Sequence, residues 1–268
     1  MSDLLVVEDL SVTFPTTRGP VDVVKSVSFT LDRDETLGIV GESGSGKSLT
    51  SLAIMGLLPK GARASGSVRL DGVELLGRPD RELRRLRGDR MSMIFQDPLS
   101  SLNPYYTVGL QIEEVYREHR GGSRKEARKV AVAALEQVGL PEPERRAGFY
   151  PHQFSGGQRQ RVMIAMALAC SPALLIADEP TTALDVTVQA QILRLLADRS
   201  GGMGLVFVTH DLAVISSIAT RVLVMRQGEQ VEYGTAEQVF AEPRHDYTRM
   251  LLDSVPRIDD PIDDEVSA

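Results

Sequence analysis

The stretch Gly41-Glu42-Ser43-Gly44-Ser45-Gly46-Lys47-Ser48 decides the fold. It matches G-x-x-x-x-G-K-[ST], the pattern of a phosphate-binding loop. The apolar run at residues 36–40 predicts a buried strand before it, and residues 48–58 have a helical pattern after it. Glycines allow a tight loop whose N–H groups point at an anion, and the helix that begins at Lys47 adds the positive end of its dipole. The stretch therefore predicts a nucleoside-triphosphate site rather than a chance glycine-rich turn.

The polar side chains of this loop have distinct expected roles. Lys47 is expected to reach the β- and γ-phosphates, and the Ser48 hydroxyl is expected to hold Mg²⁺. The loop residues expected to contact the nucleotide are Gly41, Ser43, Gly44, Ser45, Gly46, Lys47 and Ser48.

Composition limits the class of protein. The chain has 268 residues, 42% of them hydrophobic, which allows one large domain or two small ones with a real core. Its net charge of −7 argues against a nucleic-acid partner. Because Cys170 is the single cysteine, we expect neither an internal disulfide nor a Cys-ligated metal cluster. No signal peptide or membrane-spanning run is visible, so we expect a soluble, cytoplasmic protein that reaches a membrane only through a partner.

Strand and helix patterns alternate along most of the chain, which predicts a mainly parallel α/β sheet. In the strand at residues 23–31, alternation places Val23 and Val27 on one buried face, and the loop before it carries Pro15, Gly19 and Pro20. We expect further strands at residues 4–14, 36–40, 91–95, 174–179, 205–209 and 222–225, and a hairpin at 65–76 that turns at Asp71-Gly72. We expect helices at residues 108–119, 124–138, 158–170, 186–198 and 211–218, another capped by Thr235 and Gln238, and a disordered acidic tail.

The early strands are expected to form an antiparallel sheet beside the nucleotide, and residues 96–155 a mostly helical insertion. A basic stretch at residues 81–90 could contact RNA or lipid. The acidic side chains of Glu82 and Asp89 within it favour a solvated short helix.

Polar groups follow several buried strands at the edge where open α/β sheets bind ligands. Asp178 follows four apolar residues, as a carboxylate that reaches Mg²⁺ would. Glu179 comes next and could orient or deprotonate a water in line with the γ-phosphate. The alternative is that this acidic pair caps a helix, because Pro180 and Thr181 follow.

These motifs together resemble those of the ATP-binding cassette (ABC) ATPases. Ser155-Gly156-Gly157-Gln158 resembles the family signature, with Phe154 where Leu is commonest. Gln96 matches the glutamine loop, Asp185 ends the Ala-Leu-Asp of the aspartate loop, and His210 matches the switch histidine. With the phosphate loop and Asp178-Glu179, six motifs occur in the family's order.

The resemblance implies a fold and a domain organisation. The fold class is α/β, a P-loop NTPase (RecA-like) core with an antiparallel β subdomain and an inserted α-helical subdomain. The cassette would occupy residues 1–243, with the helical subdomain at about 98–160. Residues 244–268 would form a C-terminal helix and the acidic tail.

The resemblance also implies a composite site, because two cassettes of this family dimerise head to tail. ATP on one phosphate loop would be covered by Ser155, Gly156, Gly157, Gln158 and Asp185 of the other cassette. The implied catalytic residues are Glu179, His210 and Gln96, and the implied ligands of Mg²⁺ are Ser48, Gln96 and Asp178.

The resemblance implies two further positions beside the nucleotide. Phe14 is the candidate to stack on adenine, with packing in its strand as the alternative. Leu49 stands where many members have Thr, so it could contact the α-phosphate only through its backbone N–H.

Longer segments resemble the ATPases of oligopeptide, dipeptide and nickel importers. They are M-I-F-Q-D-P-L-S-S-L-N-P-Y-Y-T-V-G at 93–109, S-L-A-I-M-G-L-L-P at 51–59, P-T-T-A-L-D-V-T-V-Q at 180–189, and R-H-D-Y-T-R-M-L-L at 244–252, with Asp246 in place of Pro. The resemblance implies an ATP-hydrolysing subunit that energises uptake of peptides or nickel complexes. It would work at the cytoplasmic face of the membrane with two permease subunits, a similar but non-identical second ATPase subunit and, indirectly, an extracytoplasmic binding protein.

Several alternatives remain open at this point. They are a non-transport ABC ATPase, an ABC subunit for a different substrate, an ABC subunit that binds ATP without turnover, and a different P-loop enzyme such as a small-molecule kinase. The apolar residues Leu102, Tyr105 and Tyr106 are expected to contact a helix of a membrane subunit or to pack under the helical insertion.

Overall fold

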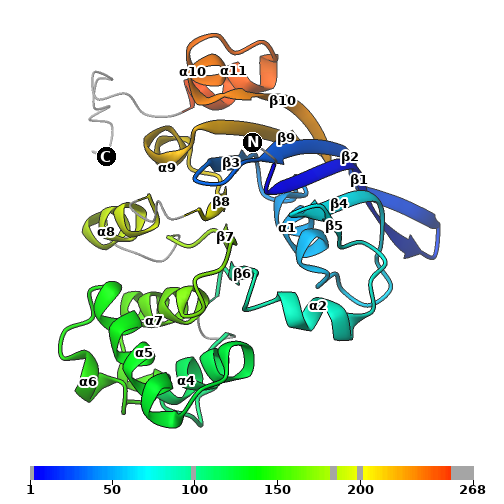
Figure 1. The fold of residues 1–268 in the computed structure, drawn as a ribbon. Coiled ribbons are helices and arrows are strands. Elements are labelled where there is room, and N and C mark those ends of the chain that lie inside the picture. Colours follow the sequence, from blue (N-terminus) through cyan, green and yellow to red (C-terminus); the bar gives the residue numbers. More distant parts are fainter. Residues whose placement is uncertain (1–2, 98–100, 182–185, 198–201, 255–268) are drawn as a thin grey trace, which may run out of the picture.

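The computed structural model describes residues 3–97, 101–181, 186–197 and 202–254. Within these ranges one sheet of ten strands has the order β5-β4-β1-β2-β10-β9-β3-β8-β7-β6 (Figure 1). The strands are β1 (Leu5–Thr16), β2 (Gly19–Leu31), β3 (Thr36–Val40), β4 (Arg63–Leu70), β5 (Val73–Glu74), β6 (Met91–Ile94), β7 (Leu174–Asp178), β8 (Gly204–Val208), β9 (Arg221–Arg226) and β10 (Glu229–Thr235). The helices are α1 (Lys47–Met55), α2 (Asp80–Leu86), α4 (Val108–Arg120), α5 (Arg124–Gln137), α6 (Pro143–Arg146), α7 (Gly156–Leu168), α8 (Val186–Ala197), α9 (Leu212–Ile218), α10 (Ala236–Ala241), α11 (Asp246–Asp253) and a 3₁₀ turn, Pro151–Gln153.

The parallel half of the sheet consists of β9, β3, β8, β7 and β6. Its strands are continuous apolar runs because both faces are covered. In β8, for example, Leu205 and Phe207 face the core that contains α7 and α9, while Val206 and Val208 face the core that contains α1. The carboxyl ends of these parallel strands meet at one edge of the sheet.

The antiparallel half consists of β1, β2, β4 and β5. Asp71 and Gly72 form the turn between β4 and β5 with positive φ angles of 47° and 75°, so the predicted hairpin is confirmed. The expected α/β core with an antiparallel part is also confirmed, but the sheet is parallel only in part. The sequence analysis missed β10, which pairs antiparallel with β9 and touches β2, and so joins the two halves.

Two details of the first hairpin differ from the sequence expectation. Pro15, Gly19 and Pro20 lie in the strands, and only the dipeptide 17–18 forms the turn. The prolines pair with each other beyond the end of β4, where a missing N–H costs no ladder bond. Val24 rather than Val23 is buried, because the positive φ of Ser26 (48°) shifts the alternation of β2.

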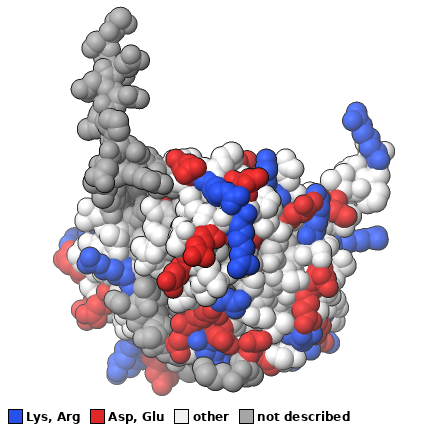
Figure 2. Space-filling view, turned by 90° about the horizontal axis from the view of Figure 1, so that it is seen from above, with Lys and Arg blue, Asp and Glu red and all other residues white. Residues whose placement is uncertain are grey.

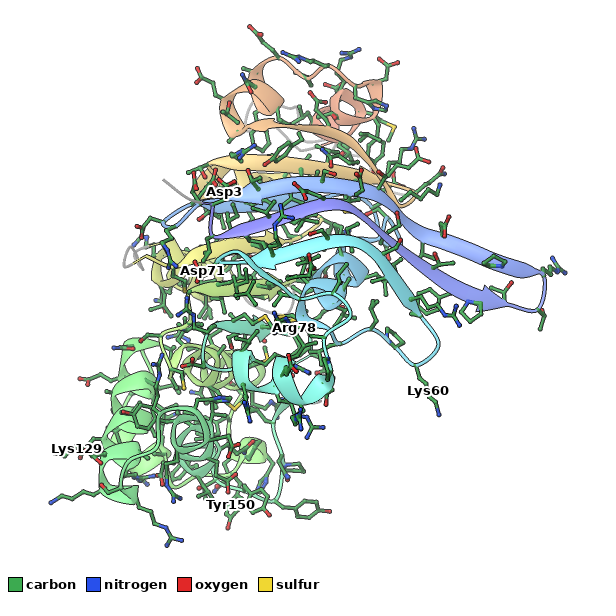
Figure 3. All side chains as sticks on the ribbon, turned by 45° about the vertical axis from the view of Figure 1, so that its right-hand side comes forward. Asp3, Lys60, Asp71, Arg78, Lys129 and Tyr150 are labelled. Atoms are coloured by element: carbon green, nitrogen blue, oxygen red, sulfur yellow. The ribbon has the colours of Figure 1, made fainter. Side chains whose placement is uncertain are left out.

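The expected helical insertion corresponds to α4–α7, which pack against one another beside β6 (Figure 1). Lys129 and Tyr150 project from this cluster away from the sheet (Figure 3). Leu102 is only 3% exposed in the core of the cluster, so its expected position at a partner surface is wrong. Tyr105, by contrast, is 85% exposed.

Within the described ranges, no helix combines the length and the apolar character needed to cross a bilayer. The predicted capping box of Thr235 and Gln238 is present at α10. The acidic tail lies outside the described residues, and the domain boundaries stay predictions.

Candidate nucleotide site

The phosphate loop connects the carboxyl end of β3 to the first residue of α1. Gly41 is required there, because a Cβ would lie 2.1 Å from the Met225 carbonyl oxygen. Gly44 and Gly46 have positive φ angles of 81° and 99°, which side-chain-bearing residues rarely adopt. Since no side chain caps α1, its N-terminal amides and dipole face the loop, as an anion site requires.

Lys47, the first residue of α1, is buried against the preceding residues of the phosphate loop. Its Nζ donates hydrogen bonds to the carbonyl oxygens of Gly41 (2.7 Å) and Glu42 (2.8 Å). Burial lowers the pKa of this ammonium, while the carboxylates of Glu179 and Asp178 oppose that shift. The predicted phosphate-binding cation is therefore held by the loop backbone at the centre of the site.

Ser48 and Asp178 come together from α1 and β7. The Ser48 hydroxyl donates to Asp178 Oδ1 at 3.1 Å. Burial raises the pKa of the Asp178 carboxyl and the nearby Glu179 adds to this, against the Ser48 hydrogen bond and Lys47. A desolvated carboxylate beside a hydroxyl is an arrangement that a bound cation would stabilise.

Glu179 lies between two of the predicted catalytic residues. Gln96 Nε2 donates to its Oε2 at 2.9 Å, and Nδ1 of His210 lies 3.2 Å from its Oε1. The three residues follow β6, β7 and β8, so the parallel order of these strands brings them to one edge. Glu179 also has a positive φ of 47°, an uncommon conformation that its backbone bond to Val208 (2.8 Å) helps to hold. These contacts favour the site interpretation of the acidic pair over a helix cap.

The signature residues form the N-terminus of α7. Ser155 Oγ accepts the N–H of Gln158 (3.4 Å), and Gln158 Oε1 accepts the N–H of Ser155 (3.2 Å), which is a capping box. Phe154 is buried in the helical core, so an apolar residue other than Leu suits this position. Gly156 is exposed, and a Cβ there would meet open space.

The structure does not bring this signature to the chain's own phosphate loop. The α7 and α1 helices lie well apart, with β6 and β7 between them (Figure 1). The composite site, in which each signature serves the nucleotide of another chain, stays a prediction.

The remaining predicted positions have mixed outcomes. Phe14 and Leu49 are half-buried against the core that contains α1, so Leu49 directs its side chain to the core rather than to a phosphate. Phe14 stays a candidate for the adenine contact. Asp185 lies outside the described residues.

Sequence reasoning missed two residues that contact the site. The buried Gln160 of α7 donates to the Pro180 carbonyl oxygen at 2.7 Å, next to Glu179. Its neighbours Gln158, Arg159 and Arg161 are polar as well, so the sequence around Gln160 carries no signal that singles it out. The hydroxyl of Tyr247 in α11 accepts the N–H of Glu42 in the phosphate loop at 3.1 Å.

The fold and this edge of the sheet define a class of nucleotide-binding cassette, and comparison with known proteins agrees. Residues 24–182 match the ABC transporter family model, and residues 231–268 match the model described as oligopeptide/dipeptide transporter, C-terminal region. The chain therefore belongs to the ABC transporter family, whose cassettes are ATPases that bind nucleotide. This confirms the family and the ATPase class expected from the motifs.

Individual relatives narrow the comparison. The oligopeptide transport ATP-binding protein OppD of Salmonella typhimurium is 55% identical over 258 residues, which cover 96% of this chain and 77% of OppD. The glutathione import ATP-binding protein GsiA of Escherichia coli K12 is 52% identical over 96% of this chain and 42% of GsiA. The dimeric structure of MJ0796, a bacterial ABC transporter cassette, has a TM-score of 0.78 at 32% identity, covering 87% of this chain and 98% of MJ0796. A structure of MJ0796 in a post-hydrolysis state, bound to ADP and Pi, matches equally well.

Proposed function

We propose that this chain is the ATP-hydrolysing subunit of an importer for short peptides, acting on separate membrane subunits. The observation that carries the hydrolytic part is Glu179, whose two carboxylate oxygens contact Gln96 and His210 beside the phosphate loop. The peptide class is supported by the identity with OppD and by the match of the C-terminal region.

The geometry supports a defined role for each residue. Glu179 accepts a proton from a water that attacks the γ-phosphorus of ATP, with Gln96 and His210 holding the carboxylate in position. Lys47 and the loop amides bind the phosphates, where fixed donors stabilise charge as it develops. The uncommon backbone conformation of Glu179 and its bond to Val208 limit its movement, so the base stays aligned.

The residues present also fit Mg²⁺. Ser48 and Asp178 offer adjacent hard oxygen atoms, and Gln96 could add an amide oxygen. Among the described residues, no three His, Cys, Asp or Glu side chains are grouped to hold a metal by themselves. Mg²⁺ in such sites is bound by one or two carboxylates together with substrate phosphates, and it would neutralise charge on those phosphates.

We further propose that ATP is covered by a second, similar but non-identical cassette. The exposed Ser155 and Gly156 at the N-terminus of α7 form a second anion-binding position, remote from the chain's own loop. The dimeric structure of the MJ0796 cassette supports the pairing of two cassettes. In this assembly residues 98–160 act as a helical subdomain of the cassette 1–243, and Asp185 contributes at the interface.

The assembly would sit peripherally at the cytoplasmic face of the membrane, bound to two permease subunits that an extracytoplasmic binding protein supplies with substrate. Basic and acidic residues are interspersed on the face shown in Figure 2, which favours protein partners over nucleic acid there. Because GsiA is a glutathione import protein and glutathione is itself a small peptide, glutathione is a substrate to compare. Nickel complexes are the second candidate.

The test is transport by a complex of this chain reconstituted with its second ATPase subunit and the membrane subunits of a peptide importer. ATP-dependent uptake of a labelled peptide should occur in proteoliposomes and should be lost with Lys47→Ala. If the complex took up glutathione or a nickel complex but did not take up longer peptides, the proposed substrate class would be overturned. The ATPase proposal would stand. Uptake that survived Lys47→Ala would overturn both.

A further inference from the structure

Tyr247 connects the C-terminal helix to the phosphate loop. It lies in α11, its side chain is 2% exposed, and its hydroxyl oxygen accepts the N–H of Glu42. Glu42 is the second residue of the phosphate loop, 205 positions earlier in the chain. A buried hydrogen bond of this kind fixes the orientation of the peptide that it contacts.

The same peptide is held from its other side by Lys47. The N–H of Glu42 and the carbonyl of Gly41 belong to one peptide unit, and that carbonyl oxygen accepts Lys47 Nζ at 2.7 Å. Because a peptide unit is planar, the Tyr247 hydroxyl and the Lys47 ammonium constrain each other through it. Rotation of this peptide would break both hydrogen bonds.

Tyr247 is itself anchored at its backbone and at its ring. Its N–H donates to His245 Nδ1 at 3.1 Å, and the carboxylate of Glu232 in β10 accepts the N–H groups of Arg244 (2.8 Å) and His245 (3.1 Å). The guanidinium carbon of Arg226, the last residue of β9, lies 4.8 Å from the ring centroid. Burial raises the pKa of the phenol, so the hydroxyl remains neutral at physiological pH.

We propose that Tyr247 is a positioning residue of the nucleotide site, which holds the Gly41–Glu42 peptide and thereby Lys47 in the geometry that binds phosphate. The inference rests on the proposed function. It assigns α11, which lies within the matched C-terminal region, a part in nucleotide affinity, in addition to the motifs between residues 41 and 210.

The test compares Tyr247→Phe with a matched control, Tyr233→Phe. Both changes remove only a hydroxyl. The hydroxyl of Tyr233 in β10 accepts the N–H of Thr30 (3.2 Å) and donates to the Thr30 carbonyl oxygen (3.1 Å). The guanidinium carbon of Arg221 lies 4.3 Å from the centroid of the Tyr233 ring. MgADP binding to the full 268-residue chain is measured by calorimetry, and melting temperature is recorded for each variant. Tyr247→Phe should raise the dissociation constant about three- to tenfold, the loss of one hydrogen bond, while Tyr233→Phe leaves it within about twofold.

Steady-state hydrolysis separates positioning from stability. Tyr247→Phe should raise KM for ATP with kcat nearly unchanged, because the loop bond acts on substrate binding. Wild-type MgADP affinity in Tyr247→Phe, or equal weakening in both variants, would overturn the inference while the proposed function stands. Failure of the wild-type chain to bind MgADP would overturn the proposed function and this inference together.

Discussion

At the residue scale, the ionised side chain of Asp178 lowers the stability of the folded protein. Its carboxylate is buried at the end of β7, and burial raises its pKa above the ordinary value of 3.8. The folded state therefore holds this proton to higher pH than the unfolded chain does. The contribution of this group to the free energy of unfolding therefore falls as pH rises from about 3.8, the ordinary pKa, through the raised pKa of the folded state. The loss of stability is complete once the carboxyl is ionised in the folded protein.

Asp178→Asn should therefore stabilise the nucleotide-free protein at neutral pH, because the amide can still accept the Ser48 hydroxyl but carries no charge. We expect a gain of about 0.5 to 2 kcal/mol, a rise of a few degrees in melting temperature. The gain should shrink as pH approaches 4, and the dependence of nucleotide binding on Mg²⁺ should weaken. A lower melting temperature than wild type at pH 7 would contradict this account of Asp178.

Glu179→Gln tests the proposed base. The amide keeps the size of the side chain but accepts a proton poorly, so hydrolysis should fall by about 10² to 10⁴ while MgATP binding persists. Single-turnover hydrolysis and equilibrium binding measure the two effects separately. Lys47→Ala is the contrasting control, in which binding itself should weaken. Wild-type turnover in Glu179→Gln within the assembled complex would refute the role.

Much of the residue-scale site was predictable, because its side chains follow buried strands whose ends meet at one edge. Gln96, Glu179 and His210 converge for that reason. Tyr247 was not predictable, because its partner is a backbone N–H 205 positions away, and a backbone contact leaves no mark in residue types.

At the scale of elements, two capping boxes of the same kind serve different purposes. Ser123 with Glu126 begins α5, and Ser155 with Gln158 begins α7. Both serines satisfy an amide at a helix N-terminus. Only the second occurs in the signature, where we propose that it also faces the ATP of a partner cassette.

Ser155→Ala and Ser123→Ala form a matched pair for this proposal. Each should cost about 0.5 to 2 kcal/mol of stability through the lost cap. Hydrolysis by the assembled complex should fall about tenfold or more in Ser155→Ala alone, because only that hydroxyl lies at the proposed shared site. Equal losses of activity in both variants would show that capping accounts for the whole effect.

Local patterns predicted most elements and failed for two features of the hairpins β1–β2 and β9–β10. Strand β10 escaped because its residues are mostly half-exposed, so it shows no continuous apolar run. The buried face of β2 was wrongly predicted because Ser26 interrupts the alternation. Ser26 has a positive φ, which is predictable for a glycine but not for a serine. Both lie in hairpins between consecutive strands: β10 pairs with β9, and Ser26 falls where the register of β2 against β1 shifts between Leu10↔Val27 and Val12↔Val24.

At the scale of the whole molecule, the segment after Gln96 connects the catalytic edge to the helical cluster. It leads from the Glu179 contact to the residues before α4. The side chain of Gln111 in α4 holds this end of the segment, since it accepts the N–H of Asn103 (2.9 Å) and donates to the carbonyls of Asn103 and Tyr106 (3.0 Å each). Gln111 thus ties residues 103–106 to α4.

Hydrophobicity alone could not separate the apolar residues of this segment. Leu102, Tyr105 and Tyr106 were expected either to contact a membrane subunit or to pack under the helical insertion, and Leu102 does the second. An irregular segment has no periodic pattern of apolar residues, so the sequence could not show which side chain turns inward. Tyr105 and Tyr106, 85% and 46% exposed, remain available to a partner helix.

The double change Tyr105→Glu with Tyr106→Glu should therefore uncouple transport from hydrolysis. Charged side chains would oppose docking of an apolar helix, while the buried Leu102 and the Gln96–Glu179 contact remain intact. Peptide uptake by the reconstituted complex should fall at least about tenfold, and ATP hydrolysis by the two ATPase subunits without the membrane subunits should stay within about twofold of wild type. Met250→Glu changes an equally apolar exposed side chain in α11, 52% exposed, and should leave uptake intact. Uptake at the wild-type rate in the double variant would place the coupling surface elsewhere. Loss of hydrolysis by the two ATPase subunits without the membrane subunits would show instead that the two tyrosines support the site itself.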